Sequence, residues 1–339
     1  MQVSKEKAIG SLKFDGCGFV PLSFILLTLE VCLLCLSIAT LCLHPLTMSP
    51  SFAQANPFAR RDTHPIQAIW TYKICTIISW LLVVVVTFYY NFHAPQDDKH
   101  SWRHTIWEQN KIHHTPFAMN AFIASFYWLF LFILQIGYVL HLFSDEAEHV
   151  NAAASVGSHF IVNNLLQFAF VMLFVRSHFI WAEVILIINF FNLSSLYFRH
   201  NTTPRFVHMP ATSGPLAWTF VALYWNGAIA VNAHNLVARI VANVAIWGIL
   251  VYGLFFLAAY KDYTMGFALS IITAAIGVGQ FFTKIFALQW IFAFAIMGTL
   301  FLATLVIAIP GIFGKEITFR RGTPLASEDQ ERAPLLDDN

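Results

Sequence analysis

Charged side chains are scarce in this sequence. Lys, Arg, Asp and Glu together make up 11% of the 339 residues, whereas hydrophobic residues make up 58%. A soluble domain averages about 25% charged and about 45–50% apolar residues. A soluble fold with this composition would lack the charged, hydrated surface that domains need in water. The shortage of charge therefore indicates an integral membrane protein.

Other absences narrow the possible functions. The net charge is only +1, so no broad electrostatic field argues for nucleic acid as a partner. The five cysteines include no pair of CxxC units, which makes a structural zinc site or a disulfide framework unexpected. No catalytic motif stands out. We therefore predict no catalytic residue, no metal and no cofactor, and an enzyme is the less favoured class.

Long apolar runs are what the sequence has instead. A membrane-spanning helix needs about 20 mostly apolar residues, and only helices or closed barrels satisfy the backbone in lipid. The alternating segments of about ten residues that mark a barrel are absent. The candidate runs are 19–43, 67–90, 115–143, 159–175, 179–198, 214–233, 237–260, 264–283 and 287–311. The predicted fold is an all-α polytopic transmembrane bundle of about 9 (8–10) helices.

Two connections between these runs are informative. Only Arg176, Ser177 and His178 separate the fourth and fifth runs, which predicts a tight hairpin. The sixth run is the least apolar, and we expect it either to be re-entrant or to be buried within the bundle.

The runs define one transmembrane domain, residues 19–311, between a polar segment at 1–18 and a tail at 312–339. We expect the tail to be disordered and cytosolic. Lys and Arg divide equally between the two sides of a nine-span chain, so the positive-inside rule decides nothing. Both terminal segments are basic, which favours a cytosolic location for both. Two cytosolic termini require an even number of spans, so one of the nine runs would not cross the membrane. The acidic connection 144–158 is expected on the lumenal side.

Polar side chains within the runs are candidates for function. Ionisable residues in mid-membrane are costly; Glu30 and Lys73 could form an ion pair that packs two helices or, less favoured, a proton- or cation-coupled site. Amides either bond helices together or line a polar cavity. The residues predicted to line a ligand cavity are Asn163, Asn164, Gln167, Glu183, Asn189, Asn192 and Asn226.

Four histidines gather between the second and third runs. His100 and His104 are spaced four residues apart, and His113 and His114 follow. This spacing could form a zinc site on a helix, but it lacks the HExxH order of a metalloprotease. We favour a solvated amphipathic segment at the membrane surface and predict no metal.

The tail carries a short sorting motif. Glu331 precedes the pair Leu335 and Leu336 by four residues, as in acidic dileucine signals that clathrin adaptors bind in cytosolic tails. This predicts a vacuolar or endosomal address, with the endoplasmic reticulum or Golgi as the alternative. Asn201 begins a weak glycosylation sequon.

Four stretches carry a family resemblance: 120–137, 181–200, 214–231 and 261–284. They resemble an uncharacterised family of fungal multi-pass membrane proteins over roughly residues 60–310. That resemblance implies a polytopic membrane protein and no known activity.

A fainter resemblance is to tryptophan-rich sensory proteins of the TspO type. Pro215, Trp218 and Asn226 in one helix, and Asn120 with Trp128 in another, carry it. It implies a helical bundle that binds hydrophobic ligands.

The function predicted from the sequence is a transporter or small-ligand-binding protein of the endomembrane system, with membrane lipid as its surroundings. The alternatives are a membrane-embedded enzyme that modifies lipid, with the four histidines as its only candidate site, or a non-catalytic accessory or scaffold protein.

Overall fold

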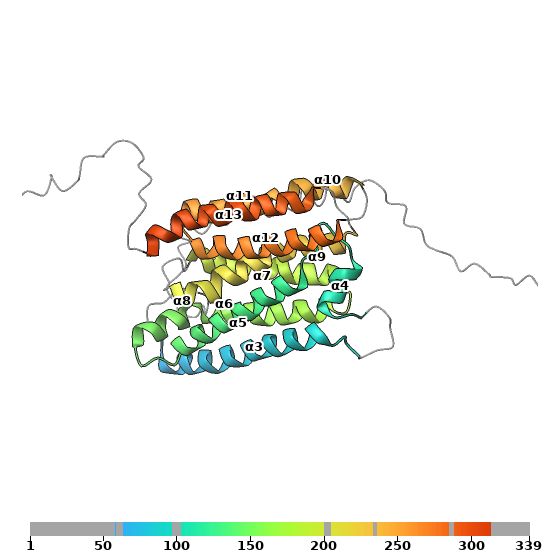
Figure 1. The fold of residues 1–339 in the computed structure, drawn as a ribbon. Helices are drawn as coiled ribbons and strands as arrows, with labels where there is room; N and C mark the ends of the chain where they lie inside the picture. The colour runs from blue at the N-terminus through green and yellow to red at the C-terminus, as the bar shows by residue number, and fades with distance from the viewer. Residues whose placement is uncertain are drawn as a thin grey trace, which may run out of the picture.

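A computed structural model of the chain describes residues 58, 64–96, 103–199, 205–232, 236–284 and 288–312. The described residues form a bundle of roughly parallel and antiparallel helices (Figure 1). The helices are α3 (Ile66–Phe92), α4 (Ile106–Ile112), α5 (Ala121–His141), α6 (Ala147–Phe174), α7 (Phe179–Arg199), α8 (Arg205–His208), the π-helix η1 (Met209–Ser213), α9 (Gly214–Ala230), α10 (Leu236–Ala245), α11 (Trp247–Tyr260), α12 (Tyr263–Thr283) and α13 (Gln289–Ile312).

Within these described ranges, seven helical segments are long and apolar enough to cross a membrane. Large apolar side chains remain exposed along their outer faces, such as Ile74 at 54%, Phe122 at 78% and Leu302 at 64%. In water such faces would drive association, whereas lipid solvates them. The all-α transmembrane prediction is therefore confirmed, and the protein is an integral membrane protein.

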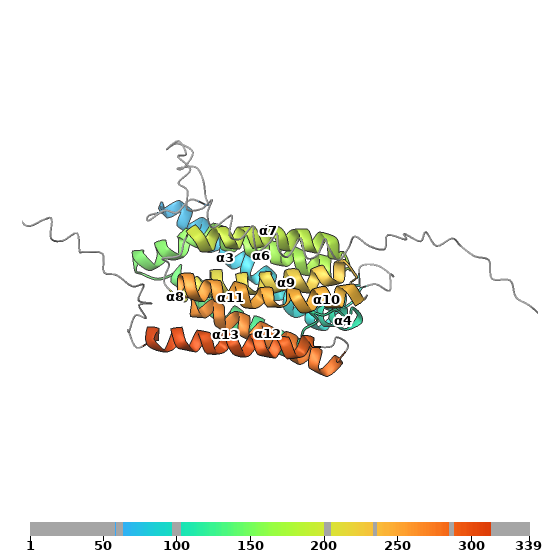
Figure 2. The same ribbon diagram turned by 90° about the horizontal axis from the view of Figure 1, so that it is seen from above.

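The helix in the centre of the bundle is α9. All but one of its residues are buried, and it lies between α7 on one side and α12 on the other (Figure 2). Together with α8 and η1 it runs from the end of the bundle where α7 finishes to the end where α10 begins (Figure 1). Of the two expectations for the sixth run, the buried position is the one observed.

A π-helical turn precedes α9 because of a proline. Pro215 has no N–H and its ring crowds the preceding turn, so a regular α-helix cannot continue through it. The backbone N–H of Gly214 instead reaches back to Met209 O, which widens the turn. Side chains of α5 bond two carbonyls of this region: Gln135 Nε2 donates to Pro210 O at 3.2 Å, and Tyr127 Oη donates to Gly214 O at 2.8 Å.

The helix boundaries differ from the apolar runs at two places. Helix α6 begins at Ala147, twelve residues before the run at 159, because Ala-rich residues of modest hydropathy still favour helix. Helix α5 begins only at Ala121, where the Asn120 side chain accepts from the N–H of Ile123 and caps the helix. The predicted hairpin at 176–178 is present, with Ser177 in the left-handed region at φ 62°.

The connectivity corrects one expectation about topology. Every described run crosses the bundle, so α13 finishes at the same end as the α5–α6 connection (Figure 1). The acidic connection between α5 and α6 and the tail after α13 therefore lie on the same side of the membrane. The connection cannot be lumenal if the tail is cytosolic. Helix α9 is not among the seven described segments that are long enough to span a membrane, and the run 19–43 lies outside the described residues, so the expectation that one run does not cross stays a prediction.

Candidate functional site

The predicted amides mostly bond helices to one another. Asn189 Nδ2 of α7 donates to Asn163 Oδ1 of α6 at 3.0 Å and to Thr219 Oγ1 of α9 at 3.5 Å. Asn164 Nδ2 donates to Ser79 Oγ of α3 at 3.4 Å, and Asn163 and Asn164 bond to each other. All these side chains are buried. The ladder links four helices, as expected where a polar group in lipid must find a protein partner.

Two further predicted residues form a pair near the α4 end of the bundle. Asn226 Nδ2 of α9 donates to Glu183 Oε2 at 2.7 Å and to Phe179 O at 2.9 Å, both on α7. Glu183 Oε1 has no hydrogen-bond partner among the described residues. Nearer the opposite end, His159 Nδ1 and Asn192 Oδ1 lie 2.8 Å apart, and Asn192 Nδ2 donates to His159 O. These contacts also join α7 to its neighbours.

Several predicted residues cannot be placed. Glu30, Asn201, Glu331, Leu335, Leu336 and His100 lie outside the described residues. Lys73 is described: its ammonium lies 5.1 Å from the ring centroid of Trp70 and 4.9 Å from that of Phe143. These are cation–π distances, so aromatic rings surround this charge.

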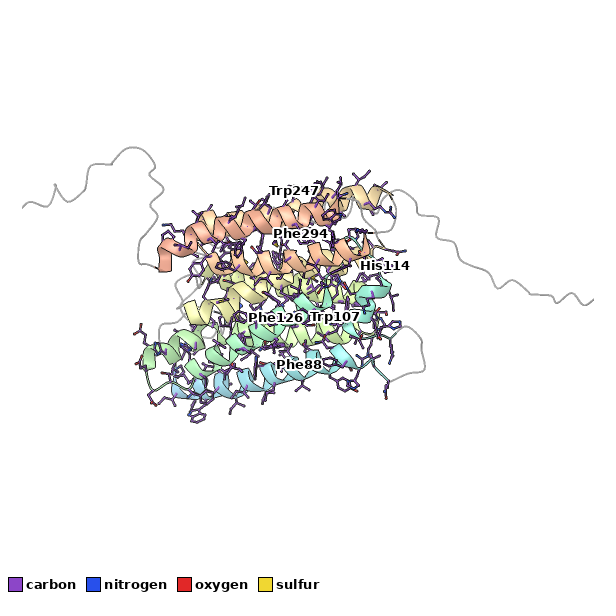
Figure 3. All side chains as sticks on the ribbon, in the orientation of Figure 1. Phe88, Trp107, His114, Phe126, Trp247 and Phe294 are labelled. Carbon is purple, nitrogen blue, oxygen red and sulfur yellow. The ribbon has the colours of Figure 1, made fainter. Side chains whose placement is uncertain are left out.

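The other histidines of the predicted cluster have separate surroundings. His113 Nδ1 lies 3.1 Å from Gln109 O, and its ring packs against Phe179, with the centroids 4.9 Å apart. His114 is exposed at the end of the bundle (Figure 3). Across the described ranges, no three His, Cys, Asp or Glu side chains come together as a metal site requires. Helix α4 buries Ile106, Gln109 and Asn110 against the bundle and exposes Glu108, Lys111 and Ile112, as an amphipathic segment does.

Four tryptophans form a continuous aromatic wall inside the bundle. Trp107 of α4 stacks on Trp225 of α9 with centroids 6.1 Å apart, and Trp225 lies 6.0 Å from Trp218. Trp218 in turn meets Trp128 of α5 edge-on at 5.2 Å. Trp225 is fixed by a hydrogen bond from its Nε1 to Asn110 Oδ1, at 2.9 Å. Because Trp218 and Trp225 are seven residues apart, they share one face of α9.

This wall borders a narrow cavity of about 30 Å³ between α3, α4, α5, α6 and α9, with room for a group of about the size of a hydroxyl. Its lining is Thr87, Asn91, Ile106, Trp107, Ser125, Trp128, Gln167, Phe170, Val171, Phe174, Trp218 and Trp225. Of the residues predicted to line a cavity, Gln167 lies here. Pockets for small molecules are typically aromatic and apolar, with a few polar groups that orient the ligand.

Four buried polar atoms of this cavity have no hydrogen-bond partner in the described part of the protein. The indole N–H groups of Trp107 and Trp218 are buried donors with no acceptor among the described residues. Thr87 Oγ1 and Asn91 Oδ1 are buried and equally unpaired. An unpaired buried polar group costs about 1–3 kcal/mol, and native proteins keep few of them. Their concentration in one cavity marks it as the candidate binding site.

A groove of about 370 Å³ between α3 and α5 continues this cavity outward. It shares Thr87, Asn91, Trp107, Ser125 and Trp128 with the inner cavity and adds apolar walls. These walls are Phe88, Phe92, Ala121, Phe122, Phe126, Leu129 and Phe132. Figure 3 shows the Phe88, Phe126 and Trp107 side chains in this region. Since both helices present exposed apolar faces, the groove opens sideways onto lipid.

Sequence reasoning overlooked most of this site. Its polar residues Thr87, Asn91 and Ser125 are small, and single small polar residues in an apolar run are common. The detectable signal is spacing: Thr87 and Asn91 are four residues apart on α3, and Ser125 and Trp128 are three apart on α5. Trp128 and Trp218 were noticed only through the resemblance to the TspO type.

A second polar centre, also not predicted, lies at the opposite end of the bundle. Asp262, between α11 and α12, caps α12 by accepting from the N–H groups of Thr264 and Met265. Its other oxygen accepts from Ser213 Oγ at 2.8 Å and Tyr197 Oη at 3.0 Å. His208 Nε2 lies 3.4 Å from the same oxygen.

This carboxylate acts as a structural anchor. Burial alone would raise the pKa of Asp262, but hydrogen bonds from His208, Thr264 and Ser213 and the attraction of His208 hold the pKa well below its usual range. Ser213 donates to this carboxylate, whose lowered pKa makes it a weak general base for activating a nucleophile. Through these contacts, the turn that holds Asp262 is linked to α7, α8, η1 and α12.

Comparison with known proteins places the chain in a family. A family model described as fungal protein of unknown function (DUF1774) matches residues 239–336. An uncharacterized protein of Schizosaccharomyces pombe is 31% identical over 249 residues, which cover 67% of this chain and 83% of the relative. No solved structure matches the chain, and the resemblance to the TspO type stays a prediction. The chain belongs to this family of fungal proteins of unknown function, which confirms the fungal resemblance noted in its sequence.

Proposed function

We propose that this protein binds a small amphipathic molecule, taken from the bilayer into the cavity between α3, α4, α5, α6 and α9. The observation that carries the proposal is the set of unpaired polar atoms inside an aromatic cavity that opens onto lipid. A ligand that bonds these atoms would remove the cost of leaving them unpaired.

The surroundings define the chemistry of the ligand. The indole N–H groups of Trp107 and Trp218 need an acceptor, and Asn91 Oδ1 needs a donor. A hydroxyl group supplies both. The body of the ligand would lie against Phe88 and Phe126 in the outer groove, so it should be a hydrocarbon. The ligand class is therefore a hydroxyl-bearing lipid or another long-chain amphiphile.

The cavity supports binding over the other predicted functions. None of its lining side chains titrates near neutral pH, so the cavity holds no general acid or base for a lipid-modifying enzyme. Transport would use the same cavity, but it also needs access from a second side, and the lining gives a lateral opening. Ligand binding is thus the function we assign first.

The test uses the full chain in nanodiscs with a diazirine-bearing hexadecanol as the photoreactive probe. Trp218→Phe keeps an aromatic ring and removes one N–H donor. Loss of one hydrogen bond, about 1–1.5 kcal/mol, should reduce specific labelling about 5- to 12-fold. Trp181→Phe is the matched control, because Trp181 is 65% exposed on α7. Equal labelling of the three proteins, or labelling outside α3, α5 and α9, would refute the proposal.

We also propose a vacuolar or endosomal address, supported by the tail motif Glu331, Leu335 and Leu336. The signal can act only if the end of the bundle where α13 finishes faces the cytosol. The experiment is imaging of the tagged protein with and without Leu335→Ala and Leu336→Ala. Diversion of the variant from the vacuole supports the proposal. An unchanged pattern in the endoplasmic reticulum or Golgi overturns it.

A further inference from the structure

A second pocket, which shares Ala121 and Phe122 with the outer groove, lies at the α4 end of the bundle. It has a volume of about 360 Å³ and lies between the segment leading into α5 and the last turn of α12. The two meet closely: the N–H of Asn120 donates to Ala275 O at 2.8 Å, and a Cβ at Gly279 would lie 2.7 Å from Ala118 O. Glycine at this position allows the backbones to touch, which fixes the pocket floor.

We propose that this pocket binds the phosphate group of an anionic lipid. Lys111 and His114 line it and are exposed, so their cationic or hydrogen-bonding ends are available at its rim. Thr115 also lines the pocket. Its side chain is 1% exposed, and its hydroxyl has no hydrogen-bond partner among the described residues. Because this unpaired hydroxyl belongs to a residue that lines the pocket, it can donate a hydrogen bond to a bound ligand.

The start of α5 adds further donors to the same pocket. Ala121 and Phe122 line it, and they are the first residues of a 21-residue helix. The N–H groups of a first turn have no partner within the helix, and the helix dipole favours an anion there. The Asn120 side chain caps the N–H of Ile123, which leaves those of Ala121 and Phe122 for a ligand.

Helix α4 also carries a carboxylate, which offsets part of the positive charge of this site. Glu108 lies one turn before Lys111 on α4, and its Oε2 accepts from the N–H of Thr105 at 2.9 Å in a capping box. That hydrogen bond is the largest of several causes, the attraction of Lys111 among them, that keep the pKa of Glu108 below its usual range, and it holds the carboxylate at the start of α4. Lys284, which follows α12, adds a further exposed cation at this end.

Two aromatic side chains indicate that the phosphate comes from a lipid. Phe122 and Phe282 border the pocket and are 78% and 74% exposed. Such side chains at a bundle surface face hydrocarbon, so acyl chains can follow them while the headgroup occupies the pocket. A soluble phosphate would use the same donors but would gain nothing from these rings.

The experiment measures lipid binding to the full-length protein. Protein in neutral detergent is titrated with phosphatidic acid, or with inorganic phosphate in a separate arm, and bound lipid is counted by native mass spectrometry. The double variant Lys111→Gln with His114→Gln should bind phosphatidic acid about 10-fold more weakly. Thr115→Val should also weaken binding, and it should not lower thermal stability, because the hydroxyl that it removes bonds no other described residue. Lys73→Gln is the control, since Lys73 lies near the opposite end of the bundle.

The outcomes separate the possibilities. Weaker lipid binding in the pocket variants, with no competition from millimolar inorganic phosphate, supports the lipid headgroup. Competition by inorganic phosphate supports the phosphate site and overturns its assignment to lipid. Equal lipid binding in the wild type, the pocket variants and Lys73→Gln overturns the proposal. None of these variants alters the tryptophan-lined cavity, so the ligand-binding proposal is tested separately.

Discussion

Replacing Asp262 should destabilise the protein strongly, although the residue lies in a two-residue turn. Asp262→Ala removes the N-cap of α12, which costs about 1 kcal/mol. It also leaves the buried hydroxyls of Tyr197 and Ser213 without their acceptor, at about 1–3 kcal/mol each. Since hydroxyls can rotate toward other acceptors, we expect a total loss of about 3–5 kcal/mol. Asp262→Asn keeps the capping oxygen and should cost about 1–2 kcal/mol.

The assay is thermal unfolding in detergent, followed by tryptophan fluorescence, at constant protein and detergent concentration. A loss of this size should lower Tm by about 6–10 °C for the alanine variant. The control is Asp145→Ala, because Asp145 is exposed in the α5–α6 connection at the same end of the bundle. We expect no measurable change for the control.

The same cluster predicts a dependence on pH with a definite sign. The folded-state pKa of Asp262 is depressed, so its contribution is fully present above the unfolded value of about 3.9. The contribution falls as the pH drops below that value toward the folded pKa. The Tm difference between wild type and Asp262→Asn should therefore shrink as the pH falls below about 4. A difference that vanishes between pH 7 and 5, or equal Tm values for Asp262→Ala and Asp145→Ala, would refute this account.

Two further predictions follow from the backbone and the topology. Gly279→Ala places a Cβ 2.7 Å from a backbone carbonyl oxygen, so it should destabilise the protein by about 2–4 kcal/mol in the same unfolding assay. Gly298→Ala is the control: a Cβ there meets nothing within 4 Å, so this variant should be neutral or slightly stabilising. The topology is tested in a cysteine-free background with a thiol reagent that does not cross membranes. The reagent should label Asp145→Cys from the side that carries a tag placed after the last residue, and it should label His178→Cys from the opposite side. Labelling of both variants from one side would contradict the fold.

Composition and run length alone predicted the architecture. Too little charge for a soluble surface, together with runs long enough to span a bilayer, left a helical transmembrane bundle as the only class. The short polar break at residues 176–178 between two apolar runs also predicted the hairpin there correctly. The start of α6 was misplaced because residues 147–158 are alanine-rich and only weakly apolar. Hydropathy detects contact with lipid, whereas helix formation here depends on backbone propensity and packing, including the close approach of Gly157 to Tyr72.

The sites depended on tertiary structure. Trp107 and Trp225 are far apart in sequence and stack in the fold, and Asp262 meets Tyr197 across 65 residues. In a soluble helix, apolar periodicity reveals the buried face. In lipid, the outer face is apolar as well, so that signal is lost.

Helices α3 and α9 illustrate the difference. Both are apolar runs in the sequence, yet α3 is largely exposed to lipid and α9 is almost wholly buried. The sequence by itself determined that these segments are helices in a membrane. Which faces meet, which polar groups find partners and which remain open to a ligand were decided only when the helices packed together.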